Sequence, residues 1–269
     1  MRAVALMLRF DQVVGIDYSG AGLPVEGLPG LQVFAAVPGE LPAAVAPPAG
    51  ARRWSRRALG HWLRARIDAG AVLLVGIDHG FSFPDSYLKR YGLDDWPTFL
   101  KDFRRHWPTL EDDCPVEAVR SGEVWRHRPD PGTRREGGSG EFRLCERWTS
   151  SAKSVFQFDM QGSVAKSTHA GIPWLHWLRT TCRPAPWCWP FDGWEPPAGR
   201  TVLTEVYPSL FRNRYPREGR NVDEQDAWAT ARWLSDTVAR GLLGRYLAPP
   251  LTVAERELAA REGWILGVS

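Results

Sequence analysis

The residues of this sequence that could act together in catalysis are acidic. Four separated segments supply carboxylates: Asp17, Asp78, Glu205, and the pair Asp223 and Asp226. Carboxylates that meet at one place repel one another, and the usual remedy is a divalent cation with hard oxygen ligands, such as Mg²⁺ or Mn²⁺. Two such ions about 3.5–4 Å apart activate a water and stabilise the leaving oxygen of an in-line phosphoryl displacement. The chemistry that we expect is therefore metal-dependent cleavage of a phosphodiester.

Two strands must place the first two carboxylates. The run Val-Gly-Ile-Asp occurs twice, ending at Asp17 and at Asp78, and each copy closes a buried apolar strand, over 12–17 and 71–78. The second strand is apolar throughout, which is typical of the middle of a largely parallel sheet. Ligands of open α/β sheets lie at the carboxyl ends of the strands. If the two strands are parallel neighbours, Asp17 and Asp78 lie close together.

The other carboxylates belong to a third strand and a long helix. Glu205 lies in a strand predicted over 201–207, where it could instead be an exposed side chain of an edge strand. Asp223 and Asp226 are three residues apart at the start of a helix predicted over 222–241, so both can project toward one place. A structural alternative is that Asp223 caps this helix, with Asp226 at its third position.

The remaining pattern predicts a single α/β domain over 1–269. Between 92 and 150 the periodicity breaks up, and residues 126–140 hold few apolar side chains, so we expect an irregular insertion there. The other predicted elements are an antiparallel strand at 31–37 and helices at 55–69, 96–107, 172–179 and 253–262.

Five short motifs occur in order along most of the chain, between about residues 12 and 240. They are Gly-Ile-Asp-Tyr-Ser-Gly at 15–20, Gly-Ile-Asp at 76–78 followed by Phe-Pro at 83–84, Gly-Ser-Val at 162–164 leading to Gly-Ile-Pro at 171–173, Thr-Glu-Val-Tyr-Pro at 204–208, and Asp-Glu-Gln-Asp-Ala at 223–227. The set resembles the predicted-nuclease family catalogued as domain of unknown function four-two-nine. The resemblance implies a ribonuclease H-like mixed sheet flanked by helices. It further implies that Asp17, Asp78 and Asp226 bind metal, with Glu205 as a further catalytic residue.

Lysines are rare here, and two of them stand among hydroxyls and glycines. Only four of the 34 basic residues are lysines, and Lys153 and Lys166 both fall between residues 151 and 168. The run Gly-Ser-Val-Ala-Lys-Ser-Thr lacks the glycine spacing of a nucleotide phosphate loop. We therefore predict that Lys153 and Lys166 contact a substrate phosphate, with solvated surface lysines as the alternative. His79 and His169 lie beside motifs, but a lone histidine is more often a hydrogen-bonded structural residue.

Composition limits the partners. Net charge is +3, which is too small for strong nonspecific attraction to nucleic acid, unless the arginines gather on one face. Two groups of arginines could do so: Arg56, Arg57, Arg64 and Arg66 on the helix at 55–69, and Arg128, Arg134, Arg135 and Arg143 in the irregular segment. The alternative is that they are solvated surface charges. The choice between DNA and RNA stays open.

The sequence also indicates where the protein works. No run approaches the roughly 18 apolar residues of a membrane span, and the apolar stretch at 3–8 is too short for a signal-peptide core. We therefore expect a cytoplasmic protein with no membrane partner. The four cysteines form no metal-binding spacing and are interpreted as buried free thiols. The tryptophan- and proline-rich stretch at 173–197 is either a base-stacking surface or, more often in such cases, a small core beneath a long loop.

The function predicted from these observations is a metal-dependent nuclease. Two rivals come from other classes. A catalytically silent nucleic-acid-binding module would tolerate loss of the carboxylates, all of which are present. An ATP-dependent phosphotransferase of the same broad fold would need glycine-rich turns after two strands, whereas only the first strand is followed by one, at 19–22. A smaller phosphate ester or nucleotide is the remaining alternative substrate.

Overall fold

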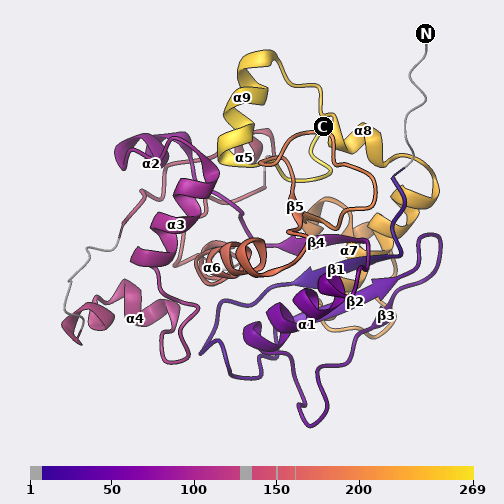
Figure 1. Cartoon of the computed structure of the whole chain (residues 1–269), viewed down its shortest axis with the longest axis horizontal. Coiled ribbons are helices and arrows are strands. Elements are labelled where there is room, and N and C mark those ends of the chain that lie inside the picture. The colour runs from indigo at the N-terminus through magenta and orange to yellow at the C-terminus, as the bar shows by residue number, and fades with distance from the viewer. Residues whose placement is uncertain (1–7, 128–134, 150, 161) are drawn as a thin grey trace.

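The chain forms a six-stranded mixed sheet packed between helices, in a computed structural model that describes residues 8–127, 135–149, 151–160 and 162–269 (Figure 1). The strands are β1 (Gln12–Asp17), β2 (Gln32–Ala36), β3 (Ala43–Ala44), β4 (Leu73–Asp78), β5 (Trp187–Cys188) and β6 (Val202–Glu205). The helices are α1 (Arg56–Asp68), α2 (Asp85–Arg90), α3 (Trp96–His106), α4 (Val116–Arg120), α5 (Leu144–Trp148), α6 (Ala165–Thr181), α7 (Val222–Ala239), α8 (Leu243–Leu247) and α9 (Val253–Glu262). Short 3₁₀ turns are η1 (Glu123–His127), η2 (Pro208–Leu210) and η3 (Arg212–Arg214).

The sheet has β1 and β4 at its centre. Its order is β3-β2-β1-β4-β6-β5, in which β2 runs antiparallel to β1 while β4 and β6 run parallel to it. The prediction that the strands ending at Asp17 and Asp78 are parallel neighbours is confirmed, as is the antiparallel return of β2. The α/β class with a mixed sheet and flanking helices is therefore correct.

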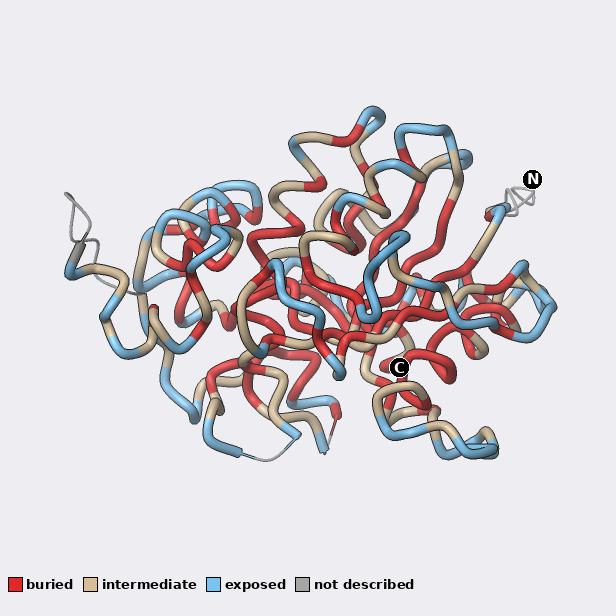
Figure 2. Tube along the Cα trace, turned by 90° about the horizontal axis from the view of Figure 1, so that it is seen from below, coloured by how far each residue is buried: buried red, intermediate tan, exposed pale blue. Residues whose placement is uncertain are grey.

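The side chains of the central strands point alternately into two separate cores, one on each face of the sheet. Successive side chains of a strand point to opposite faces of the sheet. Val14 and Ile16 of β1 join the core that contains residues of α1 and α6, whereas Val13 joins the core that contains residues of α7. Helices α1 and α6 thus cover one face and α7 covers the other. In Figure 2 the buried segments run through the middle of the molecule and the exposed segments lie around it.

Two glycines let α7 lie directly on the sheet. A Cβ on Gly15 would stand 2.2 Å from the carbonyl oxygen of Ala227, and one on Gly76 would stand 2.9 Å from Cγ2 of Thr230. Gly15 and Gly76 are also register partners across β1 and β4. The glycine in each Val-Gly-Ile-Asp run therefore allows α7 to pack closely, because a larger side chain would hold the helix away from the strands.

Helix α6 begins seven residues earlier than the sequence predicted. It passes through Pro173, which has no N–H to donate to the carbonyl of His169 four residues before it. The hydroxyl of Thr109 donates to that carbonyl instead, at 2.8 Å. This tertiary hydrogen bond, which no local pattern predicts, compensates the helix for its internal proline.

The segment at 92–150 is not an irregular appendage where the structure describes it. Helices α3, α4 and α5 and turn η1 occupy much of it, and apolar side chains of α3 and α4 belong to the same core cluster as β1 and β4. The helix expected over 96–107 is confirmed as α3, with Asp95 capping it by accepting from the Thr98 N–H at 2.7 Å. Aromatic residues of α3 pack against α6 and extend the core sideways.

Two further predictions concern the cysteines and the tryptophan-rich stretch. All four cysteines are buried and free, as predicted. Within the tryptophan-rich stretch, Trp189 is fully buried and Trp174 is 5% exposed, which favours the small-core interpretation over a stacking surface. Among the described residues no helix is long and apolar enough to cross a lipid bilayer.

Candidate active site

The first two predicted site residues lie side by side at the ends of the central strands. Asp17 and Asp78 are register partners in the parallel β1–β4 ladder, where neighbouring strands are about 4.8 Å apart. Because side chains alternate, Asp17 shares its face with Gly15, and Asp78 shares its face with Gly76. That face is the one covered by α7. Both carboxylates therefore point toward the layer that supplies the third acidic segment.

Asp226 is brought to this place by α7. The N-cap of α7 is Asn221, whose side chain accepts from the Glu224 N–H while Glu224 accepts from the Asn221 N–H. The alternative in which Asp223 caps the helix is therefore wrong, and neither aspartate is used for capping. Asp226 is 8% exposed, and its Oδ1 is buried without a hydrogen-bond partner among the described residues. A buried carboxylate oxygen without a hydrogen-bond partner lowers the stability of the fold, and it is suited to bind a cation.

Burial and neighbouring negative charges raise the pKa values of these aspartates. Burial, and after it the negative charge of Asp78, raises the pKa of Asp17 well above that of an ordinary aspartate. Asp223 and Asp226 add to the same shift. Burial, followed by the charges of Asp226 and Glu205, raises the pKa of Asp78 likewise. Burial also raises the pKa of Asp226. Mutual repulsion of this kind is what a bound cation would relieve.

Arg212 opposes that repulsion at all three aspartates. Arg212, in η3, donates from Nη1 to Oδ2 of Asp226 at 2.8 Å. Its charge lowers the pKa of Asp17, Asp78 and Asp226 against the larger effects of burial and repulsion. Arg212 therefore occupies one oxygen of Asp226 in the position where a cation would compete for it. The sequence offered no signal for this residue, because η3 follows β6 through an irregular connection.

Glu205 has different surroundings. The register partner of Glu205 is Ile77, whose side chain packs in the core on the α1 and α6 side. The side chain of Glu205 therefore leaves the sheet on the opposite face from that of Asp78. Arg143 holds both of its oxygens, donating from Nη1 to Oε2 at 2.7 Å and from Nη2 to Oε1 at 2.6 Å. The Phe81 N–H donates to Oε2 as well, at 3.0 Å. Glu205 is thus not the exposed edge residue of the alternative reading, since it is 4% exposed and bound on both oxygens.

Arg143 is the centre of a buried ionic group. It is 1% exposed, and its Nε donates to Oε1 of Glu146 at 2.9 Å. Glu262 closes the group by accepting from the Leu144 N–H at 2.6 Å, which ties α9 to α5. The prediction that Arg143 helps to form a phosphate-binding surface is therefore wrong, because its guanidinium is enclosed by carboxylates.

The carboxylate oxygens of the aspartates suit a hard cation, although these side chains are not gathered around one point. Among the residues described, no three histidine, cysteine, aspartate or glutamate side chains are arranged as they stand to hold a metal ion. The three aspartates on the α7 side nonetheless offer carboxylate oxygens, which are the ligands that Mg²⁺ and Mn²⁺ take. The Arg212–Asp226 ion pair keeps one of those oxygens engaged.

The two predicted phosphate lysines differ in their placement. Lys153 lines a cavity of about 30 Å³ together with Asp78, Glu205 and Gly162, so it lies beside the candidate site. Lys166 forms an ion pair with Glu117 of α4. The structure thus brings Lys153, and not the side chain of Lys166, to the cavity that contains Asp78.

The arginines of α1 serve mostly local contacts. Arg56 is 1% exposed and donates to three backbone carbonyls of the loop after β1, among them Ala21 at 2.6 Å. Arg57 pairs with Asp112, and Arg64 pairs with Asp68 at 3.1 Å. Arg66 donates to the Gln12 side chain at 2.7 Å. This helix is therefore not an open basic face, and Arg128 and Arg134 lie outside the described residues.

The two histidines are buried and neutral. Burial lowers the pKa of His79 to about 4 and the pKa of His169 to about 3, so both rings are neutral near pH 7. The Nδ1 of His79 lies 2.9 Å from the Gly80 carbonyl, and its ring stacks edge-on to Tyr18. A Cβ on Gly171 would stand 2.4 Å from His79 Nε2, so α6 encloses the ring.

No known family model, curated protein or solved structure matches this chain. The resemblance to a predicted-nuclease family therefore rests on its short motifs alone.

Proposed function

We propose that this protein is a metal-dependent phosphodiesterase acting on nucleic acid, with a ribonuclease H-like arrangement of its sheet. The observations that carry the proposal are that Asp17 and Asp78 lie side by side on the α7 side of two parallel strand ends, and that the negative charge of Asp226 raises the pKa of both. An antiparallel β2 beside the parallel strands β1, β4 and β6 supports the fold assignment. Functional sites of α/β sheets lie at such strand ends.

In this proposal the three aspartates bind Mg²⁺ or Mn²⁺. Such a cation would lower the pKa of a bound water and neutralise charge on the phosphoryl oxygens. Lys153, which lines the cavity beside Asp78, would contact a phosphate oxygen of the substrate. Glu205 acts as a positioning residue, because Arg143 holds both of its oxygens and it fixes the loop after β4 through the Phe81 N–H.

The two rival functions predict different dependence on the carboxylates. A silent binding module would keep its affinity for nucleic acid without any use for a cation. A phosphotransferase would need a second glycine-rich turn after β4, but that strand is followed by His79, Gly80 and Phe81, whose side chains or backbone are buried. The raised pKa values of Asp17, Asp78 and Asp226 favour cation-dependent hydrolysis over both.

The direct test is cleavage of labelled oligonucleotides. Single-stranded and duplex DNA and RNA are incubated with wild-type protein and Mg²⁺ or Mn²⁺, beside the variants Asp17→Asn and Asp78→Asn. The matched control is Asp94→Asn, an exposed aspartate on the connection before α3. We expect cleavage by wild type and Asp94→Asn, none by the two site variants, and none in Ca²⁺, which would hold the substrate uncleaved. Cleavage that persists in both site variants would refute the proposal.

A further inference from the structure

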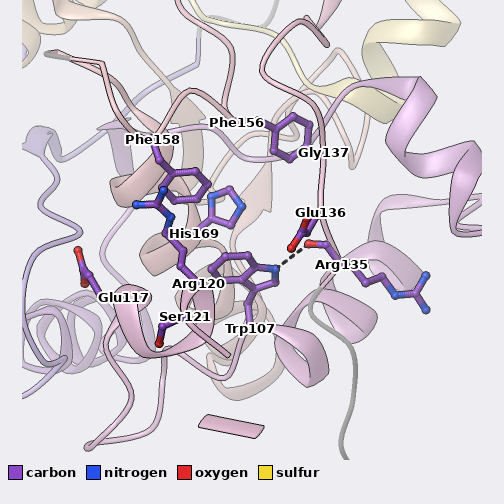
Figure 3. A pocket seen from close by; sticks show the side chains of 10 residues that line it. All are labelled: Trp107, Glu117, Arg120, Ser121, Arg135, Glu136, Gly137, Phe156, Phe158 and His169. Atoms are coloured by element: carbon purple, nitrogen blue, oxygen red, sulfur yellow. Dashed lines mark hydrogen bonds between the residues drawn. The ribbon is translucent and has the colours of Figure 1, made fainter. Parts of the chain in front are cut away.

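A second cavity, separate from the one that contains Asp78, opens between α3, α4 and the start of α6. Its volume is about 490 Å³, within the range of pockets that bind small molecules. Figure 3 shows its lining, which comes from the end of α3, from α4, from the chain after 134 and from the segment before α6. The lining residues used below are Trp107, Arg120, Ser121, Phe158 and His169. Nothing in the proposed hydrolysis uses this cavity.

Aromatic rings form its walls. The rings of Trp107 and Phe158 are nearly parallel, at 10°, with centroids 6.2 Å apart. His169 meets Trp107 edge-on, with centroids 4.3 Å apart. In Figure 3 these three rings are grouped together. Trp107 and His169 are 2% and 1% exposed, whereas Phe158 is half-buried, so Phe158 is the ring of the three that is most open to a flat ligand.

The charged groups at the rim are balanced by partners in the protein. Arg120 pairs with Asp159 at 3.1 Å and lies 4.3 Å from the centroid of the Phe158 ring. In Figure 3 the guanidinium of Arg135 points away from the ring cluster. It forms an ion pair with Asp102 at 2.7 Å. Glu117 pairs with Lys166. The cavity is therefore shaped for a flat, largely uncharged group more than for a phosphate.

His169 supplies a hydrogen-bond acceptor to this wall. Its Nδ1 lies 2.8 Å from the carbonyl oxygen of Ala165. A carbonyl oxygen can only accept, so Nδ1 carries the proton, and in the neutral ring Nε2 is left as an acceptor. Nucleobases carry amino and imino N–H groups on their edges, which a neutral acceptor of this kind can bind.

One segment of chain connects the aromatic cavity to the candidate active site. Lys153 and Gly162 line the cavity beside Asp78, whereas Phe158, between them in sequence, lines the aromatic cavity. At the start of α6, Thr168 accepts from the Gly80 N–H at 2.8 Å, in the loop that follows Asp78. The next residue, His169, lines the aromatic cavity. The two cavities thus flank the same short stretch of chain.

We propose that the aromatic cavity binds one unstacked nucleobase of the nucleic acid whose phosphodiester lies at the aspartates, a substrate assignment that rests on the proposed function. Base stacking on aromatic side chains tolerates every sequence, because each base has a flat face. A base taken out of its stack also fixes the neighbouring phosphate, which then lies at a set place relative to the carboxylates. The enzyme would accordingly prefer single-stranded or locally unpaired substrate.

The test measures base binding without hydrolysis. Free adenosine, guanosine, cytidine and uridine are titrated in EDTA against wild type, Phe158→Ala and Ser121→Trp, with binding followed by ligand-observed NMR. Ser121→Trp fills the cavity from its exposed rim and leaves the core rings in place, so it serves if Phe158→Ala fails to fold. The control is Trp148→Ala, an exposed aromatic residue of α5 outside the cavity. Wild type is also titrated with a single-stranded oligonucleotide and with the same strand carrying abasic sites.

The expected results separate this proposal from the proposed function. Wild type and Trp148→Ala bind nucleosides, and both cavity variants bind them about 5- to 150-fold more weakly, the range that corresponds to one lost stacking contact. The abasic strand binds wild type more weakly than the intact strand by a similar factor. If nucleosides bind in this way but no nucleic acid is cleaved, the base site stands and the nuclease proposal fails. Equal affinity for intact and abasic strands, or no nucleoside binding by wild type, would overturn the base site even in an active nuclease.

Discussion

Asp17 and Asp78 are register partners across two parallel strands, and the glycine two residues before each of them is also paired with its counterpart. The repeated run Val-Gly-Ile-Asp therefore has two functions in the fold. Its glycines let α7 pack on the sheet, and its aspartates lie on the face that α7 covers, where the charge of Asp226 raises the pKa of both. The candidate site depends on close helix–sheet packing as much as on the acidic residues themselves.

Replacing Gly15 tests this dependence. In Gly15→Ala the new Cβ would stand 2.2 Å from the Ala227 carbonyl, so α7 must move away from β1. We expect a loss of about 1–3 kcal/mol of unfolding free energy, typical of overpacking, together with weaker cation binding. The control is Gly140→Ala, where a Cβ would meet nothing within 4 Å. Thermal melts and Mn²⁺ titrations of both variants measure the effect. Equal Tm values and equal Mn²⁺ affinities for the two variants would show that α7 does not need a glycine at position 15.

The buried ion pair between Arg143 and Glu205 should contribute strongly to the free energy of unfolding. In Arg143→Met, Glu205 and Glu146 lose their partner inside the protein. Removing one member of a buried pair costs about 3–5 kcal/mol. The Tm should therefore fall by about 10 °C, given roughly 2–4 °C per kcal/mol for a chain of this size. Glu205→Gln should likewise lower the Tm, and a Glu205→Gln variant that melts normally but has no activity would make Glu205 a catalytic residue instead.

Arg212 should compete with the cation. Arg212→Gln removes the positive charge that pairs with Oδ2 of Asp226, so the three aspartates repel one another more strongly. We expect a lower Tm without metal and Mn²⁺ affinity tighter by about tenfold, which corresponds to about 1.4 kcal/mol. Arg214→Gln, two residues along η3 and exposed, is the matched control. Unchanged or weaker Mn²⁺ binding by Arg212→Gln would mean that the arginine supports the site.

The sequence predicted strands β1, β2, β4 and β6 and the adjacency of Asp17 and Asp78, because these features depend on local pattern. Apolar runs that end in aspartate fix β1 and β4, and the capping residues Ser55 and Asp95 fix the starts of α1 and α3. The pairing of Arg212 with Asp226 and that of Arg143 with Glu205 could not be found in this way, because these partners lie 14 and 62 residues apart in sequence. The same reason explains the late predicted start of α6, whose internal proline is compensated only through Thr109.

The raised pKa values predict how stability depends on pH. A carboxyl group whose pKa is higher in the folded protein than in the unfolded chain stabilises the fold fully below the unfolded value, near 3.8 for aspartate, and loses that contribution as pH rises through the folded value. Asp17 and Asp78 should therefore destabilise the metal-free protein once both are ionised. Added Mg²⁺ relieves their repulsion, so the rise in Tm on adding Mg²⁺ should be larger at pH 8 than at pH 5. A rise that is equal at both values would place the cation elsewhere.

The most direct measurement is calorimetric titration of Mn²⁺ into wild type, Asp78→Asn and Asp94→Asn at pH 7.5. The central claim is that the aspartates on the α7 side form a divalent-cation site. It predicts saturable binding to wild type and to Asp94→Asn, with an affinity for Asp78→Asn that is lower by about tenfold or more, equivalent to at least about 1.4 kcal/mol. The Tm of Asp78→Asn in EDTA should equal or exceed that of wild type, since one repelling charge is gone. Wild-type affinity in Asp78→Asn, or no Mn²⁺ binding by any of the three proteins, would contradict the claim.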